Sequence, residues 1–292
     1  MKSKIHASKG TSSGSIVQEV ASRPVHGWVG VVLVGVFWPL NWFVPGLRTH
    51  LLFFPLWLGY ILVVDAAVLH RRGTSLLRRS GRDFALLFVL SAPAWWLFEL
   101  FNSRTGNWIY DGIEQFNDLE YAVLSTIAFS TVMPAVFGSA EWMRSFGWIE
   151  RFRQGPKLQP TPGLCAGMVV IGLVMLSLVM AWPTYFYPFV WGSVFFLLEP
   201  LNVWLDRGSL FDYLQAGDWR PVVALCAGAL FCGFFWEMWN YYAYPKWTYY
   251  TPGVGFWYIF EMPLIGFIGY LPFALELYAL LHLAMGRRVV WL

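Results

Sequence analysis

Long apolar segments recur along the whole chain, and they constrain its fold more than any other feature of the sequence. A helix needs about 20 mainly apolar residues to cross the hydrocarbon core of a bilayer. Only 13% of the 292 residues are charged, about half the share usual in soluble domains. The sequence therefore predicts an all-α polytopic membrane protein with about eight transmembrane helices. The predicted spans are 27–45, 51–69, 84–101, 120–142, 163–182, 186–205, 221–241 and 256–283.

The basic residues predict the orientation of these spans. Of the 20 Lys and Arg residues, all but Arg48, Arg104 and Lys246 lie before the first span, after the last, or in the loops that follow even-numbered spans. Cytoplasmic loops carry the excess of Lys and Arg. Both termini are therefore expected in the cytoplasm, and we expect the bacterial inner membrane as the location. A scattered net charge of +3 does not indicate a nucleic-acid partner.

The two halves of the chain resemble each other. Phe98-Glu99-Leu100-Phe101-Asn102 matches Trp236-Glu237-Met238-Trp239-Asn240 at an offset of 138 residues. The Trp-x-Tyr triplet 108–110 matches 247–249, and Pro-x-x-x-Gly at 55–59 matches 188–192. Constant spacing of this kind indicates a tandem repeat. We expect a parallel repeat of four helices in 26–146 and in 163–283, joined by a cytoplasmic linker, 147–162. A disordered cytoplasmic tail, 1–25, and a cytoplasmic C-terminus, 284–292, flank the repeats.

Acidic residues within apolar segments are the candidates for chemistry, because an ionisable group is costly inside a membrane. Glu99 and Glu237 lie near the outer ends of spans three and seven, each followed by an asparagine at i+3, Asn102 or Asn240. Glu120 and Glu261 open spans four and eight, which places four carboxyl groups at a similar depth. A carboxyl group surrounded by hydrocarbon is expected to stay protonated and to donate a proton. Hydrogen bonding between helices is the structural alternative.

Aromatic residues accompany these acids. Side chains such as Trp236, Trp247 and Tyr249 can stabilise a carbocation through the electron-rich faces of their rings. An acid beside such rings suits a proton-initiated cyclisation of an isoprenoid. The same aromatics are also typical of the belt at a membrane interface. The spacing of histidine, cysteine and acidic residues indicates no metal site, and no metal or redox cofactor is expected.

One pattern in the second half resembles a known family. Trp236-Glu237-x-x-Asn240, Trp247-x-Tyr249, Glu261-Met262-Pro263-Leu264, Pro272 and Glu276 are similar to the lycopene cyclase domain of the heterodimeric bacterial and fused fungal type. The first half carries a weaker copy, with Glu99, Asn102, Trp108 and Tyr110. The resemblance implies a small membrane protein that protonates and cyclises the ends of a linear carotenoid. The family's motif continues into a Glu-Glu pair, for which this chain has Ile265 and Gly266.

From the residues and the resemblance together we expect a carotenoid- or terpenoid-processing membrane protein. Glu99, Glu237 and Glu261 are the predicted catalytic acids. The residues expected to orient them or to bind substrate are Asn102, Asn240, Trp108, Tyr110, Trp236, Trp247 and Tyr249. Membrane lipid and a hydrophobic isoprenoid are the expected partners, together with further subunits in a homo- or hetero-oligomer.

Two other classes of function fit the same sequence. A lipid or isoprenoid transporter would use a path that reaches both sides of the membrane, including Asp65 and Glu199. A structural subunit of a membrane complex would use its acids only for packing. The sequence leaves these alternatives open.

Overall fold

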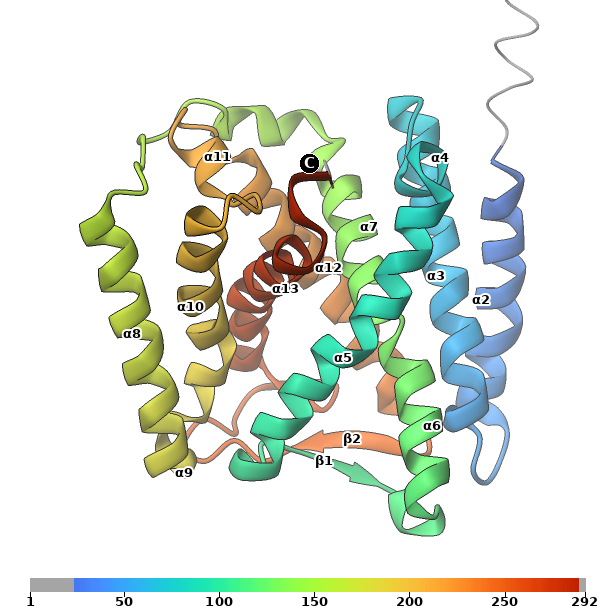
Figure 1. Cartoon of the computed structure of the whole chain (residues 1–292). Helices are drawn as coiled ribbons and strands as arrows, with labels where there is room; N and C mark the ends of the chain where they lie inside the picture. The colour runs from blue at the N-terminus through green and yellow to red at the C-terminus, as the bar shows by residue number, and fades with distance from the viewer. Residues whose placement is uncertain (1–23, 289–292) are drawn as a thin grey trace, which may run out of the picture.

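The computed structural model describes residues 24–288, and this part of the chain is an all-α bundle (Figure 1). Eight helical segments within it are long and apolar enough to cross a membrane, as predicted. Five are single helices: α2 (Val25–Phe43), α3 (Thr49–Arg72), α5 (Gly81–Thr105), α8 (Pro162–Ala181) and α12 (Arg220–Tyr241). Three are interrupted: α6 (Asp118–Phe129) with α7 (Val132–Arg144); α9 (Pro183–Phe186), η3 (Tyr187–Phe189) and α10 (Val190–Trp204); and η4 (Leu264–Gly269) with α13 (Tyr270–Met285).

Short elements fill the connections between the spans. They are α4 (Leu76–Arg79), η1 (Ile113–Gln115), η2 (Gly147–Phe152), α11 (Phe211–Leu214), η5 (Gly286–Arg288), β1 (Trp108–Asp111), β2 (Lys246–Tyr249), β3 (Tyr258–Ile259) and β4 (Met262–Pro263). The last predicted span, 256–283, began too early. The segment before Leu264 forms the β3–β4 hairpin instead, so Glu261 lies in a loop and not at the start of a helix. The tail predicted for 1–25 lies outside the described residues except for its last two.

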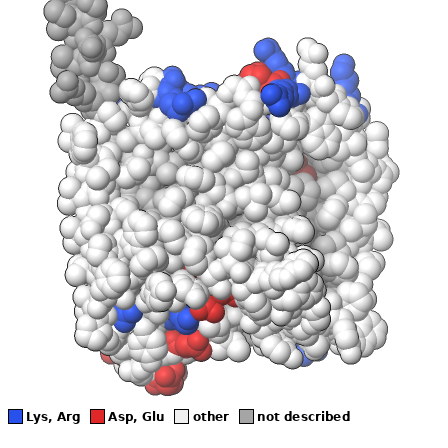
Figure 2. All heavy atoms as spheres, turned by 180° about the vertical axis from the view of Figure 1, so that it is seen from behind, with Lys and Arg blue, Asp and Glu red and all other residues white. Residues whose placement is uncertain are grey.

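The two ends of the bundle differ in charge (Figure 2). Lys and Arg side chains gather at one end, where α2 begins and α13 ends, and an almost uncharged band separates this basic end from the other (Figures 1 and 2). Such a band is what an integral membrane protein presents to lipid. On α8, the apolar side chains of Val170, Leu173 and Val174 are exposed. The opposite end carries strands β1 and β2, and we call it the ribbon end.

Glycines allow the helices to approach closely. Gly30 of α2 and Gly59 of α3 face each other so tightly that a Cβ atom on either would lie 3.0 Å or less from the other's carbonyl oxygen. Gly228 of α12 packs on Ala140 of α7, where a Cβ would lie 2.4 Å from the Ala140 nitrogen. Small residues at helix contacts are how membrane bundles gain packing energy. The α7–α12 contact joins the two predicted halves in the buried core.

Strands β1 and β2 join the halves at the ribbon end. They pair antiparallel with Trp108 opposite Tyr249, Ile109 opposite Thr248 and Tyr110 opposite Trp247. The offset between the halves equates residues 108–110 with 247–249, so this register places Ile109 opposite its own counterpart. A local twofold axis through that pair would produce such a register. The repeat over 26–146 and 163–283 remains a prediction, and the ribbon agrees with it.

Candidate functional site

The predicted motifs meet beneath the β1–β2 ribbon, where each half provides a helix end and the strand that follows it. Asn240, near the end of α12, donates from Nδ2 to the Trp247 carbonyl oxygen at 2.6 Å and accepts from the Trp247 backbone N–H at 2.9 Å. Asn102 makes the same pair of bonds to Trp108, at 2.8 and 3.1 Å. Both amides thus fix the strand on the helix.

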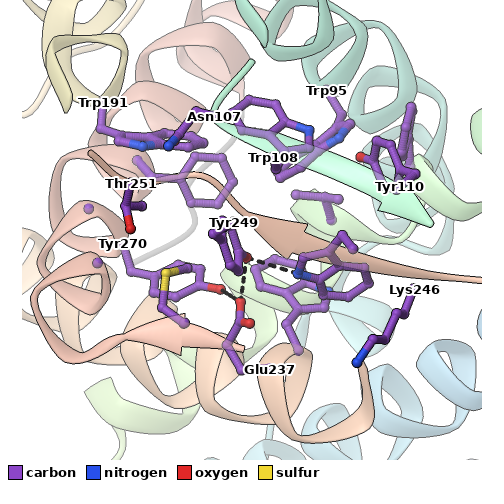
Figure 3. Close-up of a pocket in the computed structure, with 18 of the residues that line it drawn as sticks. Trp95, Asn107, Trp108, Tyr110, Trp191, Glu237, Lys246, Tyr249, Thr251 and Tyr270 are labelled. Carbon is purple, nitrogen blue, oxygen red and sulfur yellow. Dashed lines mark hydrogen bonds between the residues drawn. The ribbon is translucent and has the colours of Figure 1, made fainter. Parts of the chain in front are cut away.

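Glu237 is fully buried and is held by two tyrosines (Figure 3). Its Oε1 atom accepts hydrogen bonds from the hydroxyl groups of Tyr249, at 2.7 Å, and Tyr270, at 2.8 Å. The Trp247 indole N–H in turn donates to the Tyr249 hydroxyl at 2.8 Å. The second oxygen, Oε2, is buried and has no hydrogen-bond partner among the described residues. A protonated carboxyl group would carry its proton on that oxygen.

Glu99 occupies the corresponding place in the first half and is only partly buried. Its Oε1 atom accepts from the Tyr110 hydroxyl at 2.6 Å and from the indole N–H groups of Trp95, at 2.9 Å, and Trp108, at 3.0 Å. Each acid is therefore bound by the tyrosine of the Trp-x-Tyr triplet in its own half. Within each half, the acid, the asparagine at i+3 and the Trp-x-Tyr triplet thus lie together.

The two copies differ in their remaining donor. In the first half it is Trp95, one helical turn before Glu99. The corresponding residue before Glu237 is Gly233, and the space left by its missing side chain is filled by the Tyr270 ring, 2.6 Å from where a Cβ would lie. Tyr270 comes from α13, and the residue at the equivalent offset in the first half is Val132. In the first half the acid thus receives this hydrogen bond from its own helix, α5. In the second half the corresponding bond comes from a different helix, α13.

The ribbon tyrosines are suited to donating hydrogen bonds. Burial, followed by the nearby Glu99 carboxyl group, raises the pKa of Tyr110 well above its ordinary value. Burial and Glu237 do the same for the pKa of Tyr249. Both phenols therefore remain protonated at any physiological pH. Each can donate to a carboxyl oxygen and stabilise the carboxylate when the acid has lost its proton.

A cavity of about 680 Å³ lies beneath the ribbon, within the size range of sites for small organic ligands. Glu237 belongs to its wall, and the neighbouring wall is mainly aromatic (Figure 3). Both Trp-x-Tyr triplets contribute to it. The lining rings include Phe53, Trp95, Trp108, Tyr110, Phe129, Trp191, Trp236, Trp247, Tyr249, Tyr270 and Phe273.

The four predicted carboxyl groups do not share this cavity. Glu99 is absent from its wall and lies behind the rings of Trp95, Trp108 and Tyr110, which do line it. Glu120 is exposed and forms a capping box with Asn117 at the start of α6. Glu237 is the one predicted acid that the described wall contains.

Glu261 lies in the loop before β4 and forms an ion pair with Lys246, with 2.5 Å between Oε1 and Nζ. The acid expected to be surrounded by hydrocarbon thus contacts a basic residue, because the late start of the eighth span leaves it beside Lys246 of β2. Ile265 and Gly266, at the positions of the family's Glu-Glu pair, line the cavity and give it an apolar surface there.

Asp65 and Glu199, the acids of the transport alternative, hold loops at the basic end. Asp65 accepts from the Ser75 hydroxyl at 2.7 Å and the Leu77 N–H at 3.1 Å, and His26 Nε2 lies 3.0 Å away. Glu199 accepts from the Leu210 N–H at 2.5 Å. Each acid fixes the short segment that follows its span, which is a structural role.

Several residues of the site have no motif in the sequence. Tyr270 and Trp191 come from interrupted spans, and Trp95 is one of many tryptophans. At the repeat offset Tyr270 corresponds to Val132, so comparison of the two halves does not identify it. Comparison of the chain with protein-family models, with curated proteins and with solved structures finds no match in any of the three.

Proposed function

We propose that the cavity binds a linear isoprenoid and that Glu237 is the Brønsted acid that starts its cyclisation or isomerisation. The observation that carries this proposal is the position of Glu237, a fully buried acid in the wall of a large aromatic cavity, with one oxygen bound by Tyr249 and Tyr270 and the other unpartnered. The resemblance to the lycopene cyclase domain supports the same class of reaction.

The reaction needs no external reagent. The Glu237 O–H bond breaks as its proton adds to one carbon of a substrate double bond, and the electron pair of that bond forms the new C–H bond. A carbocation remains on the adjacent carbon. A second double bond of the chain attacks it and closes the ring. Loss of a neighbouring C–H proton to the Glu237 carboxylate restores the acid and leaves an isomer of the substrate.

The surroundings favour each stage of this sequence. The hydroxyl groups of Tyr249 and Tyr270 stabilise the carboxylate that forms when the proton leaves. Trp236 stacks near the Tyr270 ring, with 6.1 Å between ring centroids and 18° between their planes, and both rings line the cavity. Aromatic faces stabilise a cation by roughly 0.5–2 kcal/mol each. A cavity poor in polar groups also protects the cation from water.

The charge of the wall favours an uncharged substrate. Among the described residues that line the cavity, Lys246 is the only Lys or Arg, and its ammonium group is already paired with Glu261. A diphosphate ester would find no unpaired ammonium or guanidinium group in this wall. A hydrocarbon chain reaching the cavity from the membrane fits its apolar lining better.

Paired substitutions test the proposal. In a host that makes lycopene, Glu237→Gln keeps the shape of the side chain and removes the transferable proton, so product formation should fall by about 10²–10⁴-fold. Glu99→Gln is the matched control, because Glu99 accepts from the corresponding ribbon tyrosine, Tyr110, but lies outside the wall; the activity of this variant should change far less. Chromatography of the pigments measures product, and thermal melting in detergent monitors folding.

The opposite result would assign the acid to packing. If Glu237→Gln leaves product unchanged while Glu237→Leu lowers the free energy of unfolding by about 1–2 kcal/mol, Glu237 only holds Tyr249 and Tyr270 in place.

A lipid-binding or carrier protein is the second candidate, and the size of the cavity favours it independently of any acid. It predicts that wild type and Glu237→Gln bind a polyene equally and that neither alters it. Recovery of unchanged lycopene with both purified proteins would select this reading.

A further inference from the structure

The helix of the sixth span is broken at the cavity. Trp191 and Gly192 have non-helical backbone angles, and Gly192 has a φ of +123°, a conformation that side-chain-bearing residues rarely adopt. The helix resumes after the break and continues to Trp204. A break within a membrane span leaves backbone N–H groups without helical partners, and each must be bonded elsewhere within the protein.

Glu276 of α13 satisfies these groups. Its Oε1 atom accepts from the N–H of Gly192 at 2.7 Å and of Val194 at 3.1 Å, and the residue is fully buried. A carboxyl oxygen at the first turn of a helix also interacts favourably with the helix dipole. Glu276 thus stabilises the break from a neighbouring helix, and neither Gly192 nor Glu276 needs contact with a ligand to do so.

The break turns the Trp191 indole into the cavity wall. Trp191 stacks on Phe98 and Trp108, with centroid distances of 5.4 and 5.7 Å, and meets the edge of Phe273 at 5.6 Å. Gly269 leaves room for it, since a Cβ there would lie 3.3 Å from the indole ring. Figure 3 shows Trp191 across the cavity from Lys246.

The first half has no such break. Its α3 helix runs without interruption from Thr49 to Arg72. Gly59, which corresponds to Gly192, packs against α2 instead. Gly138 corresponds to Glu276, so the first half has no carboxyl group at that position. The glycine with positive φ, its carboxyl partner and the inserted indole therefore occur together in the second half, which also supplies Glu237 and Tyr270.

We infer that Trp191 determines the size of ligand that the cavity accepts and that Glu276 is the positioning residue that holds it there. This inference rests on the proposed function, because it requires the cavity to bind an isoprenoid. Replacing the indole by a methyl group should deepen the cavity for longer chains. Loss of the Glu276 acceptor should let the Trp191–Gly192 segment move, and this should also favour longer chains.

Competition between two isoprenoids measures the effect on purified full-length protein in detergent. Retinol, with 20 carbons, is the fluorescent probe, and squalene, with 30, displaces it. In Trp191→Ala the affinity for squalene relative to retinol should rise by about tenfold, equivalent to burying roughly two more methylene groups. Trp204→Ala is the matched control, since Trp204 lies on the same helix, is exposed and is not in the wall.

The variants Glu276→Gln and Glu276→Leu test whether Glu276 positions Trp191. Gln retains the Oε1 acceptor and should keep the wild-type preference, whereas Leu should shift it as Trp191→Ala does. If the Leu variant does not fold, Gly192→Ala replaces it, because a Cβ there meets only Met175 at 3.4 Å and Pro272 at 3.7 Å while the backbone is strained. An unchanged squalene preference in Trp191→Ala overturns the inference and leaves the proposed function intact. Failure of wild type to bind either probe overturns both.

Discussion

At the scale of single residues, Gly233 shows how an absent side chain builds a site. The Tyr270 ring occupies the space that a methyl group at 233 would take, and from there its hydroxyl reaches Glu237. The sequence identified Glu237, Tyr249 and Trp247 because a second copy of the motif exists for comparison. It did not identify Tyr270, because the contact depends on how closely α12 and α13 pack.

Gly233→Ala should therefore displace Tyr270 and impair the site while leaving α12 helical. A Cβ 2.6 Å from an aromatic ring forces the ring to move, and one of the two hydrogen bonds to Glu237 is lost. We expect activity to fall by about tenfold or more, the worth of roughly one hydrogen bond to a charged group. Product analysis measures this loss. Gly167→Ala, with nothing within 4 Å of its Cβ, should be silent, and equal effects from both would contradict the packing explanation.

At the scale of elements, the sequence predicted the number of spans well and their ends less well. Hydropathy registers an apolar stretch but not a break within it, so the interruptions at 130–131, 187–192 and 264–269 went unpredicted. The β3–β4 hairpin was assigned to the eighth span because Phe256, Trp257, Tyr258 and Ile259 are apolar, although they are largely exposed.

The asparagine joints between helix and ribbon give an element-scale prediction. Asn240→Leu removes both bonds to the backbone of the half-buried Trp247, which should lower the free energy of unfolding by about 1–3 kcal/mol. Asn102→Leu removes the same pair of bonds from the backbone of Trp108, which is more buried, and should cost at least as much. Thermal melting of the two variants in detergent compares them. A smaller loss at Asn102 would show that burial of the tryptophan does not govern the joints.

A cluster of charges at the basic end predicts a dependence on pH. Hydrogen bonds from Arg144 and then Arg220 lower the pKa of Glu150, and Arg220 lowers that of Asp218. Acids with depressed pKa values stabilise the fold above their unfolded values, about 4, and this contribution is lost as pH falls through the folded values. Below about pH 4 the linker should therefore loosen from the start of α12.

Hydrogen exchange, corrected for the intrinsic rate at each pH, measures this loosening. The amides of Gly155, bonded to Gly217 at 2.8 Å, and Trp219, bonded to Phe152 at 2.9 Å, should lose protection on acidification. Arg220→Gln should lower their protection already at neutral pH. Protection that is constant from pH 6 to pH 3 would rule out a role for these ion pairs.

At the scale of the whole molecule, the distribution of Lys and Arg predicts that the basic end faces the cytoplasm. A reporter fused after Asn107 or after Ala243 should read as external, since both positions lie at the ribbon end. A cytoplasmic signal at either site would contradict the eight-span topology. The spans could be predicted from the sequence because each must be long and apolar enough to cross lipid. The cavity could not, because it depends on side-chain packing between spans that are distant in the chain.

The register of the β1–β2 ribbon has a consequence for the ancestry of the chain. Because Ile109 faces its own counterpart Thr248, the same strand pairing can form between two identical copies of a single half. A four-helix precursor would then have assembled as a symmetric homodimer, with two equal acid sites and no linker. On the predicted repeat, fusion of two such genes would have freed the copies to diverge, so that the second alone acquired the Tyr270 contact and the helix break at Gly192. Co-expressed halves, separated within 153–161, should still find each other through this ribbon.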